Sequence, residues 1–287
     1  MKLCTFTRAG EQRLGAVRGE RIVDLRAADP ALPGSMLELL QGGDDALERA
    51  RRALESARGE HERARAEIAL LPPVPNPAKI ACIGLNYRDH AAEVKMALPE
   101  HVTVFAKWPN TLIGDGAPIV IPSLSHRVDY EAELAFVVGK RAHAVAEEDA
   151  GAYIAGYMCF NDVSVRDYQS RTSQWTIGKV FDTHGPCGPV LVTRDEIPDP
   201  GNLWLRTSID GEVLQDSSTA QMVFGVPRLI AELSAVMTLE PGDLIATGTP
   251  AGVGLARTPR RWIKPGERVR VEIERIGALE NLAVSAS

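Results

Sequence analysis

Acidic residues alternate along one apolar stretch of the chain. Asp129, Glu131 and Glu133 lie in the string DYEAELAFVV, and a β-strand there would place all three side chains on one face. Like charges on one strand face repel each other unless a cation holds them together. Further along the chain, the apolar run 154–160 leads to Asp162, which would lie at the end of another strand.

These carboxylates could bind a metal ion. Glu131, Glu133 and Asp162 would form an all-oxygen site, which suits Mg²⁺, Mn²⁺ or Ca²⁺ rather than Zn²⁺. In the alternative interpretation, the two glutamates lie on a solvated strand face and Asp162 begins a turn. The spacing alone leaves both interpretations open.

A histidine and a glutamate three residues apart could move a proton. His90 and Glu93 follow an apolar strand at 80–83, and a helical turn over 89–96 would make their side chains neighbours. A carboxylate beside an imidazole fixes its tautomer and raises its basicity, as a base that activates water requires. The alternative is an ordinary histidine at the start of a surface helix.

Two other polar segments could contribute to a site. Lys179 lies in a polar segment, 178–186, where it could neutralise a developing enolate or pair with Asp182 at the surface. The string TGTPAGVG at 247–254 lacks the spacing of nucleotide-binding loops. Its backbone N–H groups could bind a carboxylate, or it could be a plain tight loop.

The N-terminal part of the chain predicts a small mixed unit. Residues 1–28 alternate short apolar runs with glycine and charged turns, which is typical of strands. From Ser35 the pattern becomes helical, and a second helix capped by Asp44 or Asp45 should extend to Ala57.

A proline-rich segment, PPVPNP at 72–77, cannot continue a helix and indicates a stiff linker. We therefore expect a small N-terminal α+β domain at 1–71 and a main domain at 72–287. The main domain should be rich in short strands, with one clear helix whose first turn contains Pro227. In the strand at 268–276, apolar and charged residues alternate, so one face should be wet. The fold class expected is α+β, predominantly β.

Composition excludes several classes of function. The formal net charge is −6 and basic residues are scattered, so we expect no nucleic-acid partner. No long apolar stretch is available to cross a membrane, and no apolar signal segment is visible. The four cysteines form no CxxC pair and indicate reduced thiols. These features predict a cytoplasmic protein without a membrane partner.

Several strings, in the same order along the chain, resemble motifs of the fumarylacetoacetate hydrolase family, and especially its acylpyruvate hydrolase-like members. They cover roughly residues 79–275, about two thirds of the chain. The strings are GLNY with His90 and Glu93, DYE-x-E at 129–133, NDVSVRD at 161–167 with Gln169, GK-x-FDT at 178–183 and GTPAGVG at 248–254.

The resemblance implies a mixed β-sandwich roll, usually in homodimers, with Mg²⁺ or Mn²⁺ bound by Glu131, Glu133 and Asp162. It implies that His90 and Glu93 activate water on a segment that often orders only when ligand binds. Lys179, Gln169 and Thr249 match positions that contact substrate, and Lys107 matches a basic position near the pocket. The family usually has proline where Trp108 stands, so Trp108 could narrow the pocket.

From this resemblance we expect an enzyme that hydrolyses a carbon–carbon bond in a 2,4-dioxo acid, giving pyruvate and a carboxylic acid. The metal and Lys179 would stabilise the pyruvate enolate that leaves. An oxaloacetate-type decarboxylase or a 2-oxo acid isomerase or tautomerase would use the same ligands. The pocket around Trp108, Ser173 and Trp175 would discriminate between them. A non-enzymatic metal-binding module is disfavoured because the proton-moving pair, the lysine and the metal ligands are all present.

Overall fold

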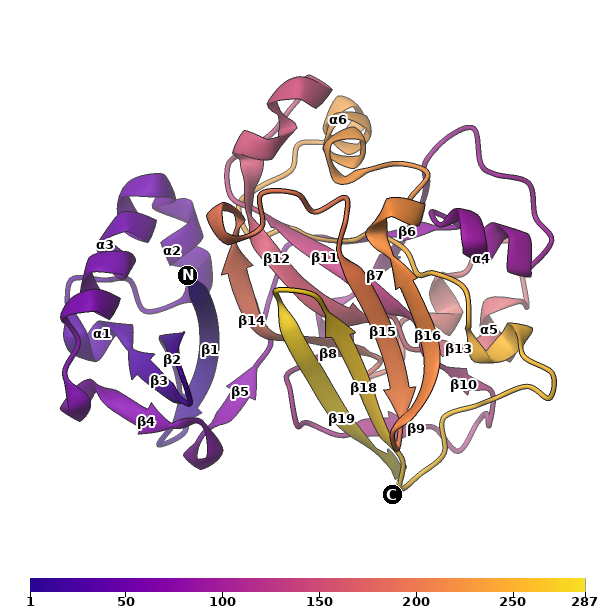
Figure 1. Ribbon diagram of the computed structural model, residues 1–287, viewed down its shortest axis with the longest axis horizontal. Coiled ribbons are helices and arrows are strands. Elements are labelled where there is room, and N and C mark those ends of the chain that lie inside the picture. Colours follow the sequence, from indigo (N-terminus) through magenta and orange to yellow (C-terminus); the bar gives the residue numbers. More distant parts are fainter. Residues whose placement is uncertain (287) are drawn as a thin grey trace.

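The computed structural model describes residues 1–286, and its elements are mostly strands. The predicted class, α+β and predominantly β, is confirmed. Two sheets stack in the body of the molecule, and the N-terminal residues form a lobe at its side (Figure 1). None of the described helices is long and apolar enough to cross a membrane.

The larger sheet extends from the N-terminal lobe through the body (Figure 1). Its order is β4-β3-β2-β1-β14-β12-β11-β17-β6-β7, with β5 beside β1 and β8 beside β14. The strands are β1 (Lys2–Arg8), β2 (Glu11–Arg18), β3 (Arg21–Asp24), β4 (Glu62–Ala64), β5 (Ala69–Leu71), β6 (Ile80–Gly84), β7 (Thr103–Lys107), β8 (Leu112–Ile113), β11 (Ala132–Val138), β12 (Ile154–Asn161), β14 (Gly185–Thr193) and β17 (Leu244–Ala246).

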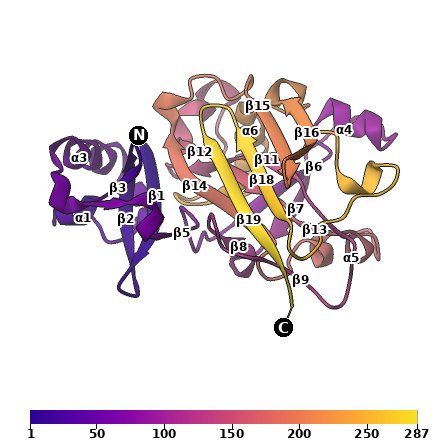
Figure 2. The same ribbon diagram turned by 60° about the horizontal axis from the view of Figure 1, so that its bottom comes forward.

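A second sheet, in the order β16-β15-β18-β19-β9, lies against strands β11, β12 and β14 of the first (Figure 2). In β18 the predicted alternation is confirmed: Val269, Val271 and Ile273 are buried, whereas Arg270 and Glu272 are partly exposed. The strands are β9 (Ile119–Ile121), β15 (Trp204–Ile209), β16 (Glu212–Ser218), β18 (Arg268–Ile273) and β19 (Gly277–Ser285).

Strand β11 is buried on both of its faces, which is why its sequence is almost continuously apolar. Leu134 and Phe136 pack into the core between the two sheets. Ala135 and Val137 point the other way, into a core that the N-terminal helices help to close. Polar side chains on this strand are therefore held inside the protein.

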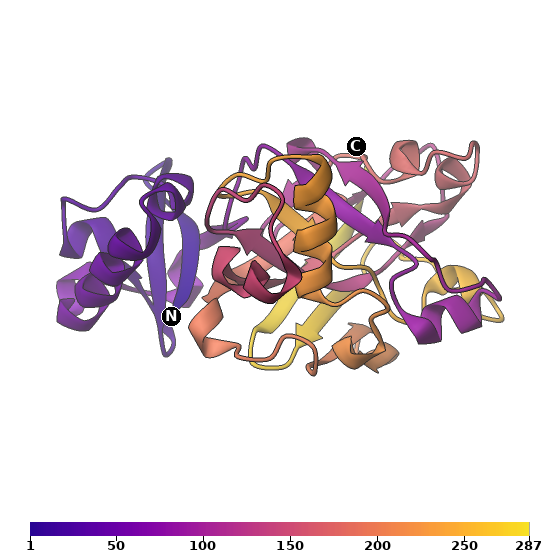
Figure 3. The same cartoon turned by 90° about the horizontal axis from the view of Figure 1, so that it is seen from above.

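The N-terminal lobe contains α1 (Leu25–Ala28), α2 (Met36–Gln41) and α3 (Gly43–Ser56) (Figure 3). Ser35 caps α2 because its hydroxyl accepts the Glu38 N–H, and the Glu38 carboxylate in turn accepts the Ser35 N–H. The predicted caps of the next helix are wrong, because α3 begins after Gly42 and both aspartates lie inside its first turn. Acidic side chains still suit this end of a helix dipole. The domain boundary after residue 71 stays a prediction.

The remaining α-helices are α4 (Arg88–Glu93), α5 (Arg166–Gln169) and α6 (Val226–Val236), with Pro227 in the first turn of α6 as expected. One strand prediction is wrong. The strand predicted over 129–138 is interrupted, because β10 (Val128–Asp129) is not part of the large sheet. It pairs instead with β13 (Ser164–Val165). The Asp129 carboxylate accepts the Tyr130 N–H, a donor that a continuous strand would use in its ladder.

Candidate active site

Three buried carboxylates meet where β11 begins and β12 ends. Ala132 of β11 lies opposite Asn161 of β12, and the Asp162 N–H donates to the Glu131 carbonyl at 2.9 Å. This register brings Glu131, Glu133 and Asp162 together, with one carboxylate oxygen from each within 4.8 Å of the others. The structure therefore assembles the predicted acidic cluster in the interior and not on a solvated face.

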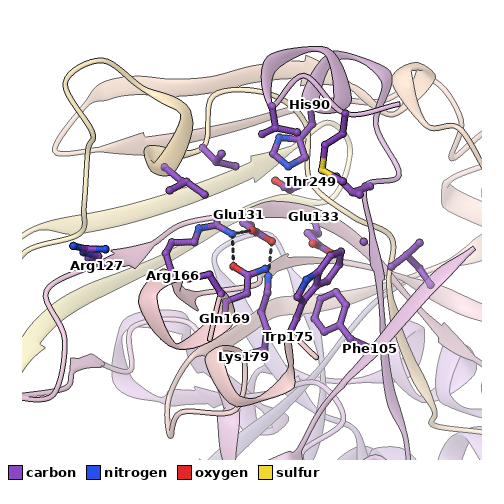
Figure 4. Close-up of a pocket in the computed structure, with 18 of the residues that line it drawn as sticks. His90, Phe105, Arg127, Glu131, Glu133, Arg166, Gln169, Trp175, Lys179 and Thr249 are labelled. Atoms are coloured by element: carbon purple, nitrogen blue, oxygen red, sulfur yellow. Dashed lines mark hydrogen bonds and ion pairs between the residues drawn. The ribbon is translucent and has the colours of Figure 1, made fainter. Parts of the chain in front are cut away.

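Three buried cations pair with this cluster, and two of them, Lys179 and Arg166, are shown in Figure 4. The Lys179 ammonium lies 2.9 Å from Glu131 and 2.7 Å from Asp162. Lys107 donates to the other oxygen of Asp162 at 2.7 Å. The Arg166 guanidinium bridges Glu131 and Asp129, each at 2.7 Å. Lys179 does not pair with Asp182, which instead accepts from the Asn110 amide.

Glu133 is the carboxylate without a cationic side chain within ion-pair distance among the residues the structure describes. Its side chain accepts the Gly248 N–H at 2.9 Å. Burial, with repulsion from Asp162 and Glu131, raises the pKa of Glu133 well above its ordinary value. Burial also raises the pKa of Glu131, but Lys179 and Arg166 outweigh that effect and lower this pKa to about 2.

The site is therefore short of positive charge. Four buried carboxylates, counting Asp129, face three cations, and the unpaired one is Glu133. Buried carboxylates of this kind are stable when they are paired or coordinate a metal. Hard carboxylate oxygens suit Mg²⁺, Mn²⁺ or Ca²⁺. Glu131, Glu133 and Asp162 fit a divalent ion that would supply the missing charge.

Gly248 holds Glu133 in place, and its conformation requires glycine. Its φ is +95°, and an added Cβ would stand 2.9 Å from the Ile83 carbonyl. This conformation points the Gly248 N–H at the carboxylate. The Gly-rich segment thus contributes a carboxylate-binding N–H, although the carboxylate belongs to the protein itself.

His90 and Glu93 lie on α4, as the sequence predicts. The His90 Nδ1 atom is 3.3 Å from the Glu93 carboxylate. The other Glu93 oxygen accepts the Gly252 N–H at 2.9 Å, and Asp89 accepts the Ser217 hydroxyl at 2.6 Å. Since Glu93 engages Nδ1, Nε2 is the ring atom left to exchange a proton.

A cavity of about 450 Å³ lies between α4 and the carboxylates (Figure 4). Phe105 and Trp175 stand on one side of it with their rings edge to face, 5.8 Å between centroids. Arg166 and Arg127 stand on the other side (Figure 4). The buried Arg166 lines the cavity, and one nitrogen of its guanidinium, Nη2, has no hydrogen-bond partner among the described residues.

The other predicted substrate contacts divide into two groups. Gln169 and Thr249 line the cavity. Lys107 does not, because it is buried behind Asp162 and donates to it and to the Val163 carbonyl. Trp108 is 54% exposed and lies outside the cavity wall, so it does not narrow the pocket as expected. Of the predicted discriminating residues, Trp175 lines the cavity and Ser173 does not.

Sequence reasoning assigned no role to Arg166. It is buried, it bonds to two acidic residues and to Gln169, and it faces the cavity. The signal was available in the string NDVSVRD, where an arginine follows Asp162 by four residues, directly after the two valines. A buried arginine in such a position requires an acidic partner.

Comparisons with known proteins agree with this geometry. The family model described as fumarylacetoacetate (FAA) hydrolase C-terminal matches residues 79–284, so the chain belongs to this family of enzymes. Oxaloacetate tautomerase fahd2, mitochondrial, from Xenopus laevis is 47% identical over 93% of this chain and 83% of its own.

Solved structures show the same fold over the whole chain. Fumarylacetoacetate hydrolase from Exiguobacterium antarcticum has a TM-score of 0.87 and 33% identity, with 100% of both chains covered. Maleylpyruvate hydrolase from Sphingobium sp. SYK-6, in complex with manganese (II) ion and pyruvate, has a TM-score of 0.83 and 34% identity, again with 100% of both chains covered.

The expected cytoplasmic location is wrong. The Xenopus laevis relative is named as mitochondrial, as are the rat and human relatives at 43% and 42% identity. The expectation depended on the lack of an apolar signal segment. Mitochondrial targeting uses amphipathic, basic segments instead, so that absence does not exclude an organelle.

Proposed function

We propose that this protein catalyses the keto–enol tautomerisation of oxaloacetate or a closely related 2-oxo acid, with Mg²⁺ or Mn²⁺ at the carboxylate cluster. One observation carries the proposal. A cluster of buried carboxylates short of one positive charge borders a cavity that the guanidinium-bearing Arg166 also lines, and one nitrogen of that guanidinium has no partner among the described residues. The name of the Xenopus laevis relative supports tautomerisation more than the hydrolysis expected from the sequence.

The site would bind the acid through fixed positive charge. The buried Arg166 lines the cavity and would attract a carboxylate through its guanidinium charge, and the Gln169 amide oxygen beside it accepts from that guanidinium. Burial lowers the pKa of Lys179, but Asp162 and Glu131 outweigh that effect and raise it above its ordinary value, so the ammonium stays charged. When bound at Glu131, Glu133 and Asp162, a divalent ion would add positive charge that stabilises negative charge on the 2-oxo group.

Tautomerisation moves one proton and breaks no bond of the carbon skeleton. Going from enol to keto, the enol oxygen loses a proton and C3 gains one. His90 is suited to carry this proton because Glu93 fixes its ring and leaves Nε2 available. Lys179 and Arg166 would hold the negative charge on the oxygen while the proton is in transit.

Hydrolysis of a 2,4-dioxo acid is the second candidate. A relative of 34% identity that shares the fold over its whole length is a maleylpyruvate hydrolase with manganese and pyruvate. The same His90–Glu93 pair could activate a water molecule instead of accepting a proton from C3. Whether the bound acid leaves room for that water decides between the two reactions.

Both reactions can be tested with one preparation. The ultraviolet absorbance of enol oxaloacetate should decay faster with enzyme and Mn²⁺ than with Mn²⁺ alone, and EDTA should abolish the difference. Pyruvate release from acetylpyruvate is measured in parallel. Turnover of acetylpyruvate without acceleration of the enol decay would reject the tautomerase in favour of the hydrolase.

We also propose that the chain forms a homodimer. Strand β7 is an edge of the large sheet, and Val104 and the adjacent Trp108 are 47% and 54% exposed. An apolar patch on an edge strand supports a contact with a second copy. Sedimentation equilibrium should give twice the chain mass, and a monomer at micromolar concentration would reject the proposal.

A further inference from the structure

One buried amide joins the strand of the carboxylates to the Gly-rich loop. Gln215 lies on β16, is 1% exposed and does not line the cavity. Its Oε1 atom accepts the Ala132 N–H at 2.9 Å and the Thr207 hydroxyl at 2.8 Å. Its Nε2 atom donates to the Thr249 hydroxyl oxygen and to the Pro250 carbonyl, each at 2.9 Å. Both acceptor positions and both donor hydrogens of the amide are therefore in use.

The partners fix the orientation of this amide. A backbone N–H only donates and a carbonyl only accepts, so Ala132 requires the amide oxygen and Pro250 requires the nitrogen. The Thr249 hydroxyl then accepts from Nε2, and its own hydrogen goes to the Ala132 carbonyl at 2.9 Å. Gln215, Thr249 and Ala132 thus form a closed ring in which each residue donates to one neighbour and accepts from the other. Hydrogen bonds linked in one direction strengthen each other.

The ring holds the backbone between two of the candidate metal ligands. Ala132 separates Glu131 from Glu133, and the two peptide groups that join them are held, one by its N–H and the other by its carbonyl. In the view of Figure 4, Thr249 lies between His90 and these two glutamates. The spacing of the two carboxylates along the strand therefore depends on the ring.

The Gly-rich loop also lies directly against β16. Gly252 has a φ of +103°, and an added Cβ would stand 2.2 Å from the Leu214 carbonyl, so only glycine permits this approach. The Gly248 N–H donates to Glu133, and the Gly252 N–H donates to Glu93. The buried amide of β16 binds the loop between these two donors. One side chain therefore fixes a loop that contacts both the metal cluster and the proton-moving pair.

We propose that Gln215 is a positioning residue for the metal site, which it serves without contact with the cavity. Its oxygen fixes the strand that carries Glu131 and Glu133. Its nitrogen fixes the loop that holds Glu133 and that lines the cavity through Thr249. The proposal rests on the metal-dependent function proposed for the carboxylate cluster, and it explains how two ligands keep their spacing.

Gln215→Met is the principal test, because methionine fills a similar volume and makes none of the amide's hydrogen bonds. Calorimetric titration of the full chain with Mn²⁺ should give an affinity about tenfold lower than that of the unaltered protein. An effect of this size is typical of residues that orient metal ligands without touching the metal. Enol decay at subsaturating Mn²⁺ should slow by a similar factor.

Asn281→Leu is the matched control, because it also removes a buried amide. Asn281 lies on β19, is 2% exposed and donates to the Gly114 and Ala117 carbonyls at 2.9 and 2.8 Å. It does not line the cavity. Both substitutions should lower the melting temperature, since both leave buried polar groups without a partner. Only Gln215→Met should weaken Mn²⁺ binding.

Thr207→Val provides a second test if Gln215→Met does not fold. Thr207 is buried on β15, and its hydroxyl donates to the Gln215 amide oxygen at 2.8 Å. Valine has nearly the same shape, so this change loosens Gln215 without altering Ala132 or the loop. We expect Mn²⁺ binding to weaken about threefold, because the other partners of the amide remain.

The outcomes separate the positioning role from the proposed function. Normal Mn²⁺ affinity in folded Gln215→Met protein overturns the proposal, as does normal affinity in Thr207→Val if the first variant does not fold. Equal weakening in Asn281→Leu and Gln215→Met also overturns it, because metal affinity would then follow stability. If the unaltered protein binds no Mn²⁺, the proposed function fails, and the positioning role fails with it.

Discussion

The carboxylate cluster and helix α4 face the same cavity, but they are held in opposite ways. Glu131, Glu133 and Asp162 are buried where central strands meet, and their neighbours are charged side chains equally buried. His90 and Glu93 lie on a six-residue helix, and their side chains are 12% and 22% exposed. Groups that would bind the ion are therefore fixed in advance, whereas the proton-moving pair depends on a few hydrogen bonds from a small helix.

The largest effects should come from the cluster. Glu131→Gln and Glu133→Gln should each weaken Mn²⁺ binding by at least about 100-fold and abolish turnover, because each removes one of three charged oxygen ligands. Calorimetric titration with Mn²⁺ measures this directly. Retention of near-normal Mn²⁺ affinity by either variant would remove that glutamate from the set of ligands.

The same two variants should differ in stability without metal. Glu131→Gln leaves Lys179 and Arg166 short of a partner and should cost about 3 kcal/mol of unfolding free energy. Glu133→Gln removes the unpaired carboxylate and should be neutral or stabilising. Urea unfolding in EDTA gives both values, and equal losses would contradict the charge balance derived for the cluster.

The next largest effect should come from a substitution in α4, and it should not change the affinity for the metal. His90→Gln should lower kcat about 1000-fold, because the remaining side chain cannot exchange a proton, while Mn²⁺ affinity stays within about twofold. Steady-state kinetics and metal titration on the same sample test this. A parallel loss of Mn²⁺ binding would show that the two regions are not separable.

Asp129 connects the cluster with the loop that meets α4. Its buried carboxylate accepts from Arg166 at 2.7 Å and from the N–H groups of Gly254 and Leu255 at 2.7 and 2.9 Å. Asp129→Asn replaces one accepting oxygen with a donor, so Arg166 should lose its alignment and kcat/KM should fall about tenfold. Mn²⁺ affinity should barely change, which calorimetry would check. A complete loss of metal would make Asp129 a ligand.

The smallest effect should come from the contact between α4 and β16. Ser217→Ala removes the hydroxyl that donates to Asp89 at 2.6 Å and should lower kcat/KM about threefold. Hydrogen exchange at residues 88–93 should speed up, while exchange in β11 stays unchanged. Faster exchange in both segments would mean that the cluster and the helix move as one unit.

Local patterns made much of this arrangement predictable. The alternation in β18, the capping box at Ser35 and the neighbouring positions of His90 and Glu93 all follow from residues close together in sequence. The acidic cluster did not follow from spacing alone, which also allowed a solvated strand face; the family resemblance was needed to bring Asp162 to Glu131 and Glu133.

Long-range pairing accounts for what sequence could not provide. The Lys107 side chain pairs with Asp162 and does not line the cavity. This placement depends on how β7 pairs with β6 at the edge of the sheet. The break before β11 depends on Arg166 and on a loop more than a hundred residues later, because both bind Asp129. Neither contact can be inferred from the periodicity of the sequence.

The pairing of β1 with β14 has a consequence for how the protein can be shortened. The family match begins at residue 79, but Lys2 and Leu3 cover the backbone of Val192 and Leu191. A chain cut at residue 79 would leave that backbone as an open, apolar edge, and such edges recruit other strands. The N-terminal strand therefore covers an edge that would otherwise be open to pairing with other chains.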